Sequence, residues 1–115
     1  MSDQPARLSI RIDCNGARFG PGKAALLAAI GEAGSVTAAA QALGMSYPRA
    51  LKLADEMNRQ FTGPLVDKHH GGAARGGAKL TPLGAQVLAA YEAICATAEK
   101  RNAAALTAFA SLLKP

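Results

Sequence analysis

Residues 35–61, with the sequence SVTAAAQALGMSYPRALKLADEMNRQF, predict two helices joined by a tight turn. Ser35 can accept hydrogen bonds from the free N–H groups of the first helix. Gly44 can end that helix because glycine enters the left-handed conformation at little cost. Ser46 then provides the N-cap of the second helix, and Pro48 lies in its first turn, where no N–H group is needed. Two short helices around a glycine turn are typical of a helix-turn-helix.

The spacing of apolar residues predicts the faces on which the two helices meet. The first helix offers small residues for close contact, at Ala38, Ala39, Ala42 and Leu43. The second helix repeats apolar residues at helical spacing, at Ala50, Ala54, Met57 and Phe61. Its opposite face carries Arg49, Lys52, Glu56 and Arg59. A recognition helix of this kind would present Tyr47, Arg49 and Lys52 to a DNA groove. For this stretch alone, an ordinary αα-hairpin in a helical core is the alternative.

The composition is that of one globular domain. The 115 residues are 50% hydrophobic and can bury one modest core. The formal net charge of +5 favours polyanionic partners and permits DNA binding. Cys14 and Cys95 are far apart in apolar surroundings, which favours buried thiols over a disulfide. The chain has no run of about 18 apolar residues and no signal-peptide pattern, so we expect a cytoplasmic protein with no membrane partner.

Two segments precede the helix-turn-helix. Apolar residues alternate with polar ones, as in a half-buried strand, at Leu8, Ile10 and Ile12. Asn15-Gly16 is typical of a type I′ hairpin turn, so residues 8–19 are expected to form a β-hairpin. From Lys23 a helix is expected to run to Gly34 and to pack behind the helix-turn-helix.

A glycine-rich segment follows the second helix. Residues 65–68 and 78–80 are predicted to be short strands, and the glycines between them prevent a helix. A hairpin directly after a recognition helix is typical of the wing of a winged helix. Its cationic side chains suit a phosphate backbone or a minor groove. These side chains are Lys68, His69, His70, Arg75 and Lys79. The alternative is a surface loop that is basic without binding DNA.

Thr81-Pro82 can begin a last helix. Its apolar residues fall on one face, at Leu83, Val87, Tyr91, Ile94, Cys95 and Ala98. The pattern resumes after Asn102, which predicts either one helix of about thirty residues or two helices with a break near Asn102. Because so small a core cannot cover the whole stripe, we expect a homodimer through it. The expected interface residues are Val87, Tyr91, Ile94, Leu106, Phe109 and Leu113.

Several consecutive segments match a known family in order and spacing. They are the run GPGKAALLAAIGEAGSVTAAAQALGMSYPRALKLADEMNRQF, then LV, the Gly-Gly-rich hairpin and LTPLGAQVLAAYE. Together these segments resemble the DNA-binding domain of ModE-type molybdate-responsive transcription regulators. The helix-turn-helix itself is also similar to the LysR type. The resemblance spans residues 8–99. It implies a winged helix-turn-helix that forms a homodimer mainly through its long C-terminal helix. It places residues 45–47, Arg49 and Lys52 on the recognition helix and residues 69–79 on the wing.

Three differences from that family bear on function. Pro48 stands where such proteins usually carry a polar or basic residue, and Leu51 stands where an aromatic residue is frequent, so the operator can differ. Full-length members continue into oxyanion-binding domains, whereas this chain stops at Pro115. We therefore expect no molybdate site in these residues, no cofactor, and a separate oxyanion-binding protein as partner if the regulator is coupled to molybdenum.

Together these features predict a mostly α protein with small β-hairpins, a winged helix-turn-helix with a long C-terminal dimerisation helix. We expect one domain over residues 1–115, divided into an N-terminal hairpin (8–19), a helical core with helix-turn-helix and wing (22–81) and a dimerisation helix (82–113). The expected function is transcriptional regulation by sequence-specific binding of double-stranded operator DNA, without catalysis. The alternative is a protein-interaction module whose C-terminal helix docks a separate sensor subunit.

The residues expected to contact DNA are Ser35, Thr37, Ser46, Tyr47, Arg49, Lys52, Lys68, His69, His70, Arg75 and Lys79. No convergent set of residues predicts an enzyme. The adjacent His69 and His70, even with Asp67, lack the ligand spacing of a zinc site. The Gly-Gly-rich hairpin lacks the flanking elements and the Lys-Ser/Thr ending of a P-loop.

Overall fold

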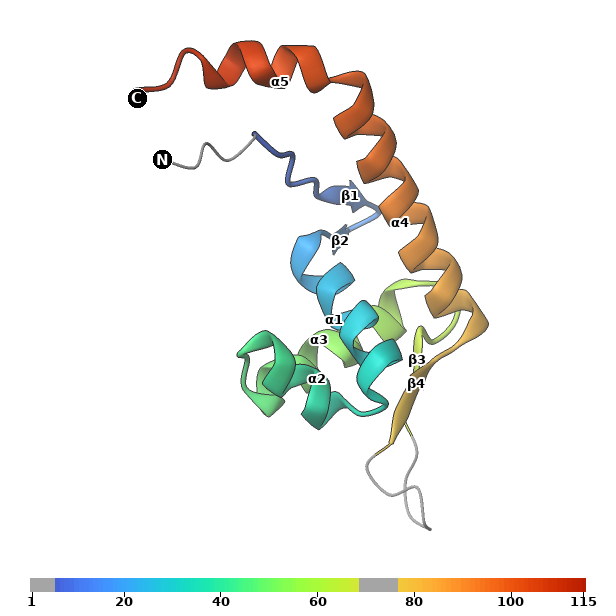
Figure 1. Ribbon diagram of the computed structural model, residues 1–115. Helices are drawn as coiled ribbons and strands as arrows, with labels where there is room; N and C mark the ends of the chain where they lie inside the picture. Colours follow the sequence, from blue (N-terminus) through green and yellow to red (C-terminus); the bar gives the residue numbers. More distant parts are fainter. Residues whose placement is uncertain (1–5, 69–76) are drawn as a thin grey trace.

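The computed structural model describes residues 6–68 and 77–115 of the chain (Figure 1). In chain order its elements are β1 (Ile12–Cys14), β2 (Ala17–Phe19), α1 (Pro21–Ala33), α2 (Val36–Leu43), α3 (Tyr47–Gln60), β3 (Val66–Lys68), β4 (Ala78–Leu80), α4 (Pro82–Arg101) and α5 (Ala103–Ala110). The strands form two antiparallel hairpins, β1 with β2 and β3 with β4. The predicted fold class, a mostly helical winged helix-turn-helix with small hairpins and a long C-terminal helix, is confirmed.

The first hairpin turns at Asn15 and Gly16, as predicted. Both residues have positive φ, 51° and 81°, which a type I′ turn requires. The predicted strand from Leu8 is wrong, because β1 begins only at Ile12. The preceding segment is instead held by α4, through a hydrogen bond of 2.6 Å from the Tyr91 hydroxyl to the Ile10 carbonyl oxygen.

The helix-turn-helix is built as its capping residues predict. Ser35 Oγ accepts a hydrogen bond of 3.0 Å from Ala38 N, and Ser46 Oγ accepts one of 3.3 Å from Arg49 N. Gly44 ends α2 in the left-handed conformation, at φ 66°. The predicted contact face of α2 is wrong in part: its buried residues are Val36, Ala39 and Ala40, whereas Ala42 and Leu43 are exposed.

The core forms around α1. Its Leu26, Leu27 and Ile30 are fully buried, together with Met57 of α3 and the Leu65-Val66 pair. The Ala78 N–H donates a hydrogen bond of 2.8 Å to the Gly34 carbonyl oxygen, which ties β4 to the end of α1. Phe19 packs edge-to-face against Phe61 and Tyr91, with ring centroids 6.1 and 5.1 Å away.

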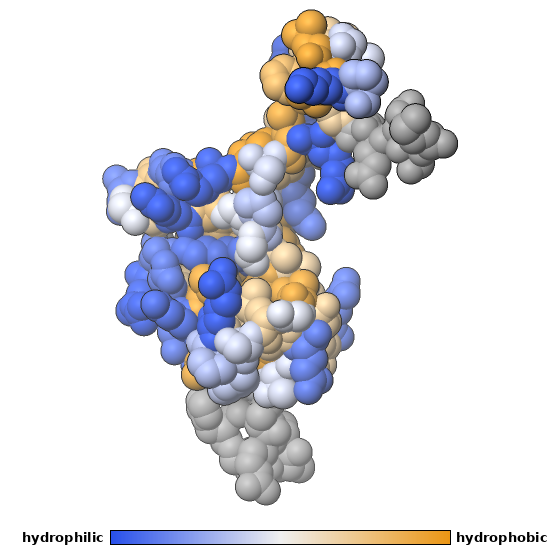
Figure 2. Space-filling model, turned by 90° about the vertical axis from the view of Figure 1, so that its left-hand side faces the viewer, coloured by the Kyte–Doolittle hydropathy of each residue, from blue (hydrophilic) through white to orange (hydrophobic). Residues whose placement is uncertain are grey.

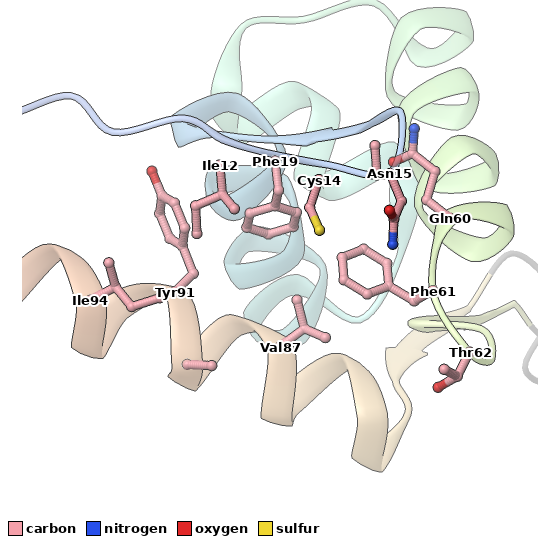
Figure 3. Close-up of a pocket in the computed structure, with 12 residues that line it drawn as sticks. Ile12, Cys14, Asn15, Phe19, Gln60, Phe61, Thr62, Val87, Tyr91 and Ile94 are labelled. Carbon is pink, nitrogen blue, oxygen red and sulfur yellow. The ribbon is translucent and has the colours of Figure 1, made fainter.

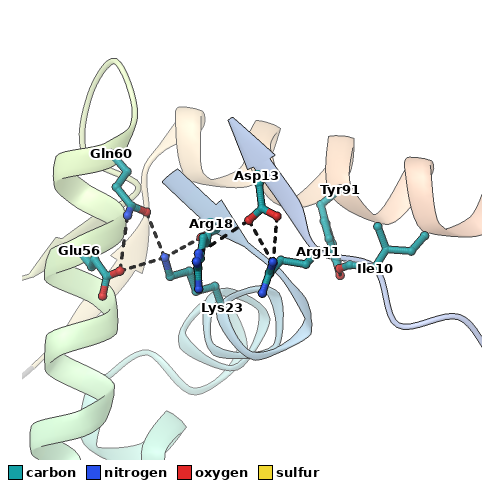
Figure 4. A network of polar contacts seen from close by, with 8 residues as sticks. All are labelled: Ile10, Arg11, Asp13, Arg18, Lys23, Glu56, Gln60 and Tyr91. Atoms are coloured by element: carbon teal, nitrogen blue, oxygen red, sulfur yellow. Dashed lines mark hydrogen bonds and ion pairs between the residues drawn. The ribbon is translucent and has the colours of Figure 1, made fainter. Parts of the chain in front are cut away.

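A buried lysine joins three elements (Figure 4). Lys23 Nζ donates hydrogen bonds to the Arg18 carbonyl oxygen at 2.6 Å, to Gln60 Oε1 at 3.0 Å and to Glu56 Oε1 at 3.3 Å. A buried cation needs such partners because its desolvation is costly. Glu56 therefore does not belong to the exposed face of α3 on which the sequence placed it.

The C-terminal segment forms two helices, α4 and α5, and not one long helix. This is the second of the two predicted alternatives. The Asn102 N–H donates to the Ala98 carbonyl oxygen at 3.1 Å, and the Asn102 side chain donates to the same oxygen at 2.7 Å. The side chain thus competes with the helical pattern of the backbone at this point. After the break α5 runs at a steep angle to α4, across the top of the molecule in Figure 1.

Two further predictions about burial are wrong. Cys14 is exposed, not buried, although it is a free thiol as expected. Tyr91 was expected to add to the apolar surface that one copy leaves uncovered, but it is 7% exposed and packs in the core of its own chain.

The pKa of Tyr91 predicts how the free energy of unfolding depends on pH. Burial raises its pKa to about 12 from the ordinary value of 10.0, and the Cys95 thiol beside it adds to the effect. The folded state therefore keeps a proton that the unfolded chain loses, and the free energy of unfolding should fall as pH rises from about 10 to about 12. Urea unfolding across this range checks the point. Tyr91→Phe should reduce the fall, and an unchanged fall in this variant would contradict the prediction.

Candidate nucleic-acid interface

The first two turns of α3 present a polar, cationic surface. Tyr47 is 47% exposed, and Arg49 and Lys52 are also exposed. The opposite face of the helix, with Ala50, Ala54 and Met57, is buried. The helix is thus anchored along one side, and the three side chains predicted to contact DNA share the exposed part. This is the arrangement in which a recognition helix can enter a major groove.

The N-cap of α3 directly precedes that surface in the chain, and the N-cap of α2 begins the helix before it. The Ser46 hydroxyl is occupied as an acceptor by its cap but keeps its own O–H for donation, and the same holds for Ser35. Thr37, in the first turn of α2, is exposed. Hydroxyl groups of this kind can contact phosphates while they stabilise the helix.

The structure describes the base of the wing, which is the β3–β4 hairpin. Asp67 of β3 pairs with Lys79 of β4, and both residues are exposed. Lys68 behaves differently, because its Nζ lies 2.6 Å from Asp55 Oδ1 of α3. To bind a phosphate, Lys68 would have to give up this ion pair with Asp55. His69, His70 and Arg75, which the sequence placed on the wing, lie outside the described residues.

Sequence reasoning missed Asn58, which joins α3 to the wing. Its Oδ1 accepts hydrogen bonds from Leu65 N at 2.8 Å and Val66 N at 3.0 Å, and its Nδ2 donates to the Val66 carbonyl oxygen at 3.0 Å. The available signal was an amide side chain in the last turn of a predicted helix that a Thr-Gly-Pro break follows. Such an amide can satisfy the backbone groups of the chain that returns past it.

A second surface of the molecule is apolar (Figure 3). A groove of about 590 Å³ lies between the N-terminal hairpin, the end of α3 and the middle of α4. Val87, Tyr91 and Ile94, three of the predicted dimer residues, line it on the α4 side. The other three, Leu106, Phe109 and Leu113, are in or just after α5, where Phe109 and Leu113 are each 61% exposed.

Within residues 6–68 and 77–115, no three histidine, cysteine, aspartate or glutamate side chains are grouped as metal ligands would be. In the same parts of the chain, no helix is both long and apolar enough to cross a bilayer.

Comparison with known proteins finds similar sequences among bacterial regulators and molybdenum proteins. The molybdenum-pterin-binding protein MopB of Rhodobacter capsulatus is 47% identical over 83 residues, which cover 72% of this chain and 31% of that protein. MopA of the same organism is 33% identical over 92 residues, or 79% of this chain and 35% of that protein. The molybdenum transport protein ModE of Azotobacter vinelandii is 36% identical over 89 residues, or 77% of this chain and 33% of that protein.

The chain thus spans about a third of the length of these relatives, which is consistent with the resemblance to the ModE-type DNA-binding domain alone. The sequence profile of the "Bacterial regulatory helix-turn-helix protein, lysR family" matches residues 23–85, from α1 through the wing to the start of α4. The matched residues include α3 with its exposed cationic face. By this match, the chain belongs to the lysR family of bacterial regulatory helix-turn-helix proteins.

Proposed function

We propose that this protein is a transcriptional regulator linked to molybdenum metabolism, and that it binds operator DNA as a homodimer. The observation that carries the proposal is the exposed set Tyr47, Arg49 and Lys52 on the second helix of a lysR-family helix-turn-helix. The link to molybdenum rests on the named relatives, two molybdenum-pterin-binding proteins and a molybdenum transport protein.

Arg49→Ala tests the reading of bases. We expect it to weaken binding to fragments selected from the organism's own genome more than binding to random DNA, since an arginine in the first turn of a recognition helix can reach base edges. A bidentate contact contributes about 1–3 kcal/mol of discrimination, or roughly 5- to 150-fold. Titrations of both DNAs measure the difference.

Arg59→Ala is the matched control, because Arg59 is an exposed arginine at the other end of the same helix. It should change binding to both DNAs equally. If Arg49→Ala also weakens both equally, Arg49 does not read bases.

The wing is proposed to contact the DNA backbone. Arg75→Ala and Lys79→Ala should weaken binding to all sequences and reduce the slope of log affinity against log salt by about 0.9 for each phosphate that the variant no longer binds. Titrations at several salt concentrations give the slope. An unchanged slope in both variants would remove the wing from the interface.

The dimer is proposed to form through α4 and α5. No residue of α5 is buried, although Phe109 and the following Leu112 and Leu113 are large and apolar. Figure 2 shows apolar residues on the arm that α5 forms at the top of the molecule. Residues 103–113 contain no charged side chain, and the apolar groove offers a complementary surface along α4. A second copy can cover both surfaces at once by two-fold symmetry.

The same uncovered surface supports a second candidate function. A separate oxyanion-binding subunit could dock on α5, so that the winged helix serves protein contact as well as DNA binding. Sedimentation of the purified chain distinguishes the two: a homodimer favours the regulator as proposed, and a monomer favours a different partner.

A further inference from the structure

We propose that Asn58 is a positioning residue that holds the wing in the orientation in which Lys79 reaches a DNA phosphate. The inference rests on the proposed DNA-binding function and adds a role for a residue that itself faces the wing and not the DNA. One amide group of Asn58 makes three hydrogen bonds to the chain that leads into β3, at 2.8, 3.0 and 3.0 Å.

A second contact joins the same two elements. Asp55 lies three residues before Asn58, so both side chains are on one face of α3. Asp55 Oδ1 accepts a hydrogen bond of 2.6 Å from Lys68 Nζ, at the other end of β3. The recognition helix therefore holds β3 at its start through Asn58 and at its end through Asp55.

The position of Lys79 follows from that of β3. Lys79 lies opposite Asp67 in the β3–β4 ladder, one residue from the pair Lys68 and Ala78. Ala78 is in turn bonded to the end of α1. Without the hydrogen bonds of Asn58, the hairpin would stay paired but α3 would hold it at one end only. The wing would then no longer share a fixed geometry with the helix that enters the groove.

A double-mutant cycle on a duplex of random sequence tests this, because phosphate contacts do not require the operator. In the wild type, Lys79→Ala should reduce the salt slope by about 0.9, the value for one phosphate contact. In the Asn58→Ala background the same substitution should change the slope much less. Equal reductions in both backgrounds would overturn the positioning role, since independent sites behave additively.

Two further variants separate positioning from stability. Ile30→Val lowers stability from inside the core without removing any hydrogen bond between α3 and the wing, and in its background Lys79→Ala should keep its full effect. Asp55→Ala removes the second contact and does not depend on Asn58→Ala being folded. It should also reduce the effect of Lys79→Ala, and a full effect in the Asp55→Ala background would count against the inference. If the wild type shows no salt-dependent DNA binding, both the positioning role and the proposed function fail. If the wild type binds DNA but the effects of the two substitutions are additive, only the positioning role fails.

Discussion

Gly84→Ala is expected to lower the free energy of unfolding by about 3 kcal/mol or more, because a side chain at this position meets backbone. A Cβ on Gly84 would lie 2.1 Å from the Leu65 carbonyl oxygen and 3.0 Å from the Leu65 carbonyl carbon. That carbonyl cannot simply move away, since it accepts a hydrogen bond of 3.0 Å from Thr81 N. The Thr81 hydroxyl also donates to the Pro64 carbonyl oxygen at 2.7 Å. Thermal unfolding should show a midpoint lower by about 10 °C or more.

Gly22→Ala is the matched control. Gly22 is also inside a helix, but a Cβ there meets nothing within 4 Å. Alanine is the better helix former, so this variant should be as stable as the wild type or more stable, by up to about 1 kcal/mol. If Gly84→Ala unfolds at the same temperature as Gly22→Ala, α4 does not pack on Leu65 as closely as these distances require.

The features that the sequence predicted well are those that depend on neighbouring residues. Asn15-Gly16, the caps at Ser35 and Ser46, and the turn at Gly44 each follow from the preference of one residue for one backbone conformation. The exposed position of Arg49 and Lys52 follows from helical spacing against the buried Ala50 and Met57 in the same way.

The errors have two physical causes. Alanine occurs on several sides of α2, so spacing alone identified Ala39 but could not choose Ala40 over Ala42 for the rest of its buried face. The other errors concern contacts between residues far apart in the chain, which no local pattern encodes. Tyr91 bonds to Ile10 and lies in the core, and Glu56 bonds to Lys23 and is partly buried, so neither residue lies on the exposed surface to which it was assigned. For the same reason the contact of Asp55 with Lys68 could not be predicted, whereas Asn58, just before the Thr-Gly-Pro break, had a local signal that sequence reasoning missed.

Phe109→Glu is expected to convert the proposed homodimer into a monomer and to weaken operator binding by roughly 100- to 10,000-fold, the range over which linked binding units exceed single ones. Phe109 is 61% exposed in one copy, so the substitution should leave the fold of the protomer intact. In the dimer interface the introduced carboxylate would be desolvated without a compensating hydrogen bond or ion pair. Sedimentation at micromolar concentration gives the oligomeric state, and titration of the selected operator gives the affinity.

Thr107→Glu is the matched control, because it places the same charge on an exposed residue of the same helix. It should keep the dimer and the affinity for the operator. Two-fold symmetry adds an independent expectation: the operator should be a near palindrome with half-sites about 34 Å apart, or a multiple of that distance, and an isolated half-site should bind the wild type and Phe109→Glu with similar affinity. A wild-type monomer with an intact α5, or a Phe109→Glu dimer that binds the whole operator normally, would show that α5 does not join two copies.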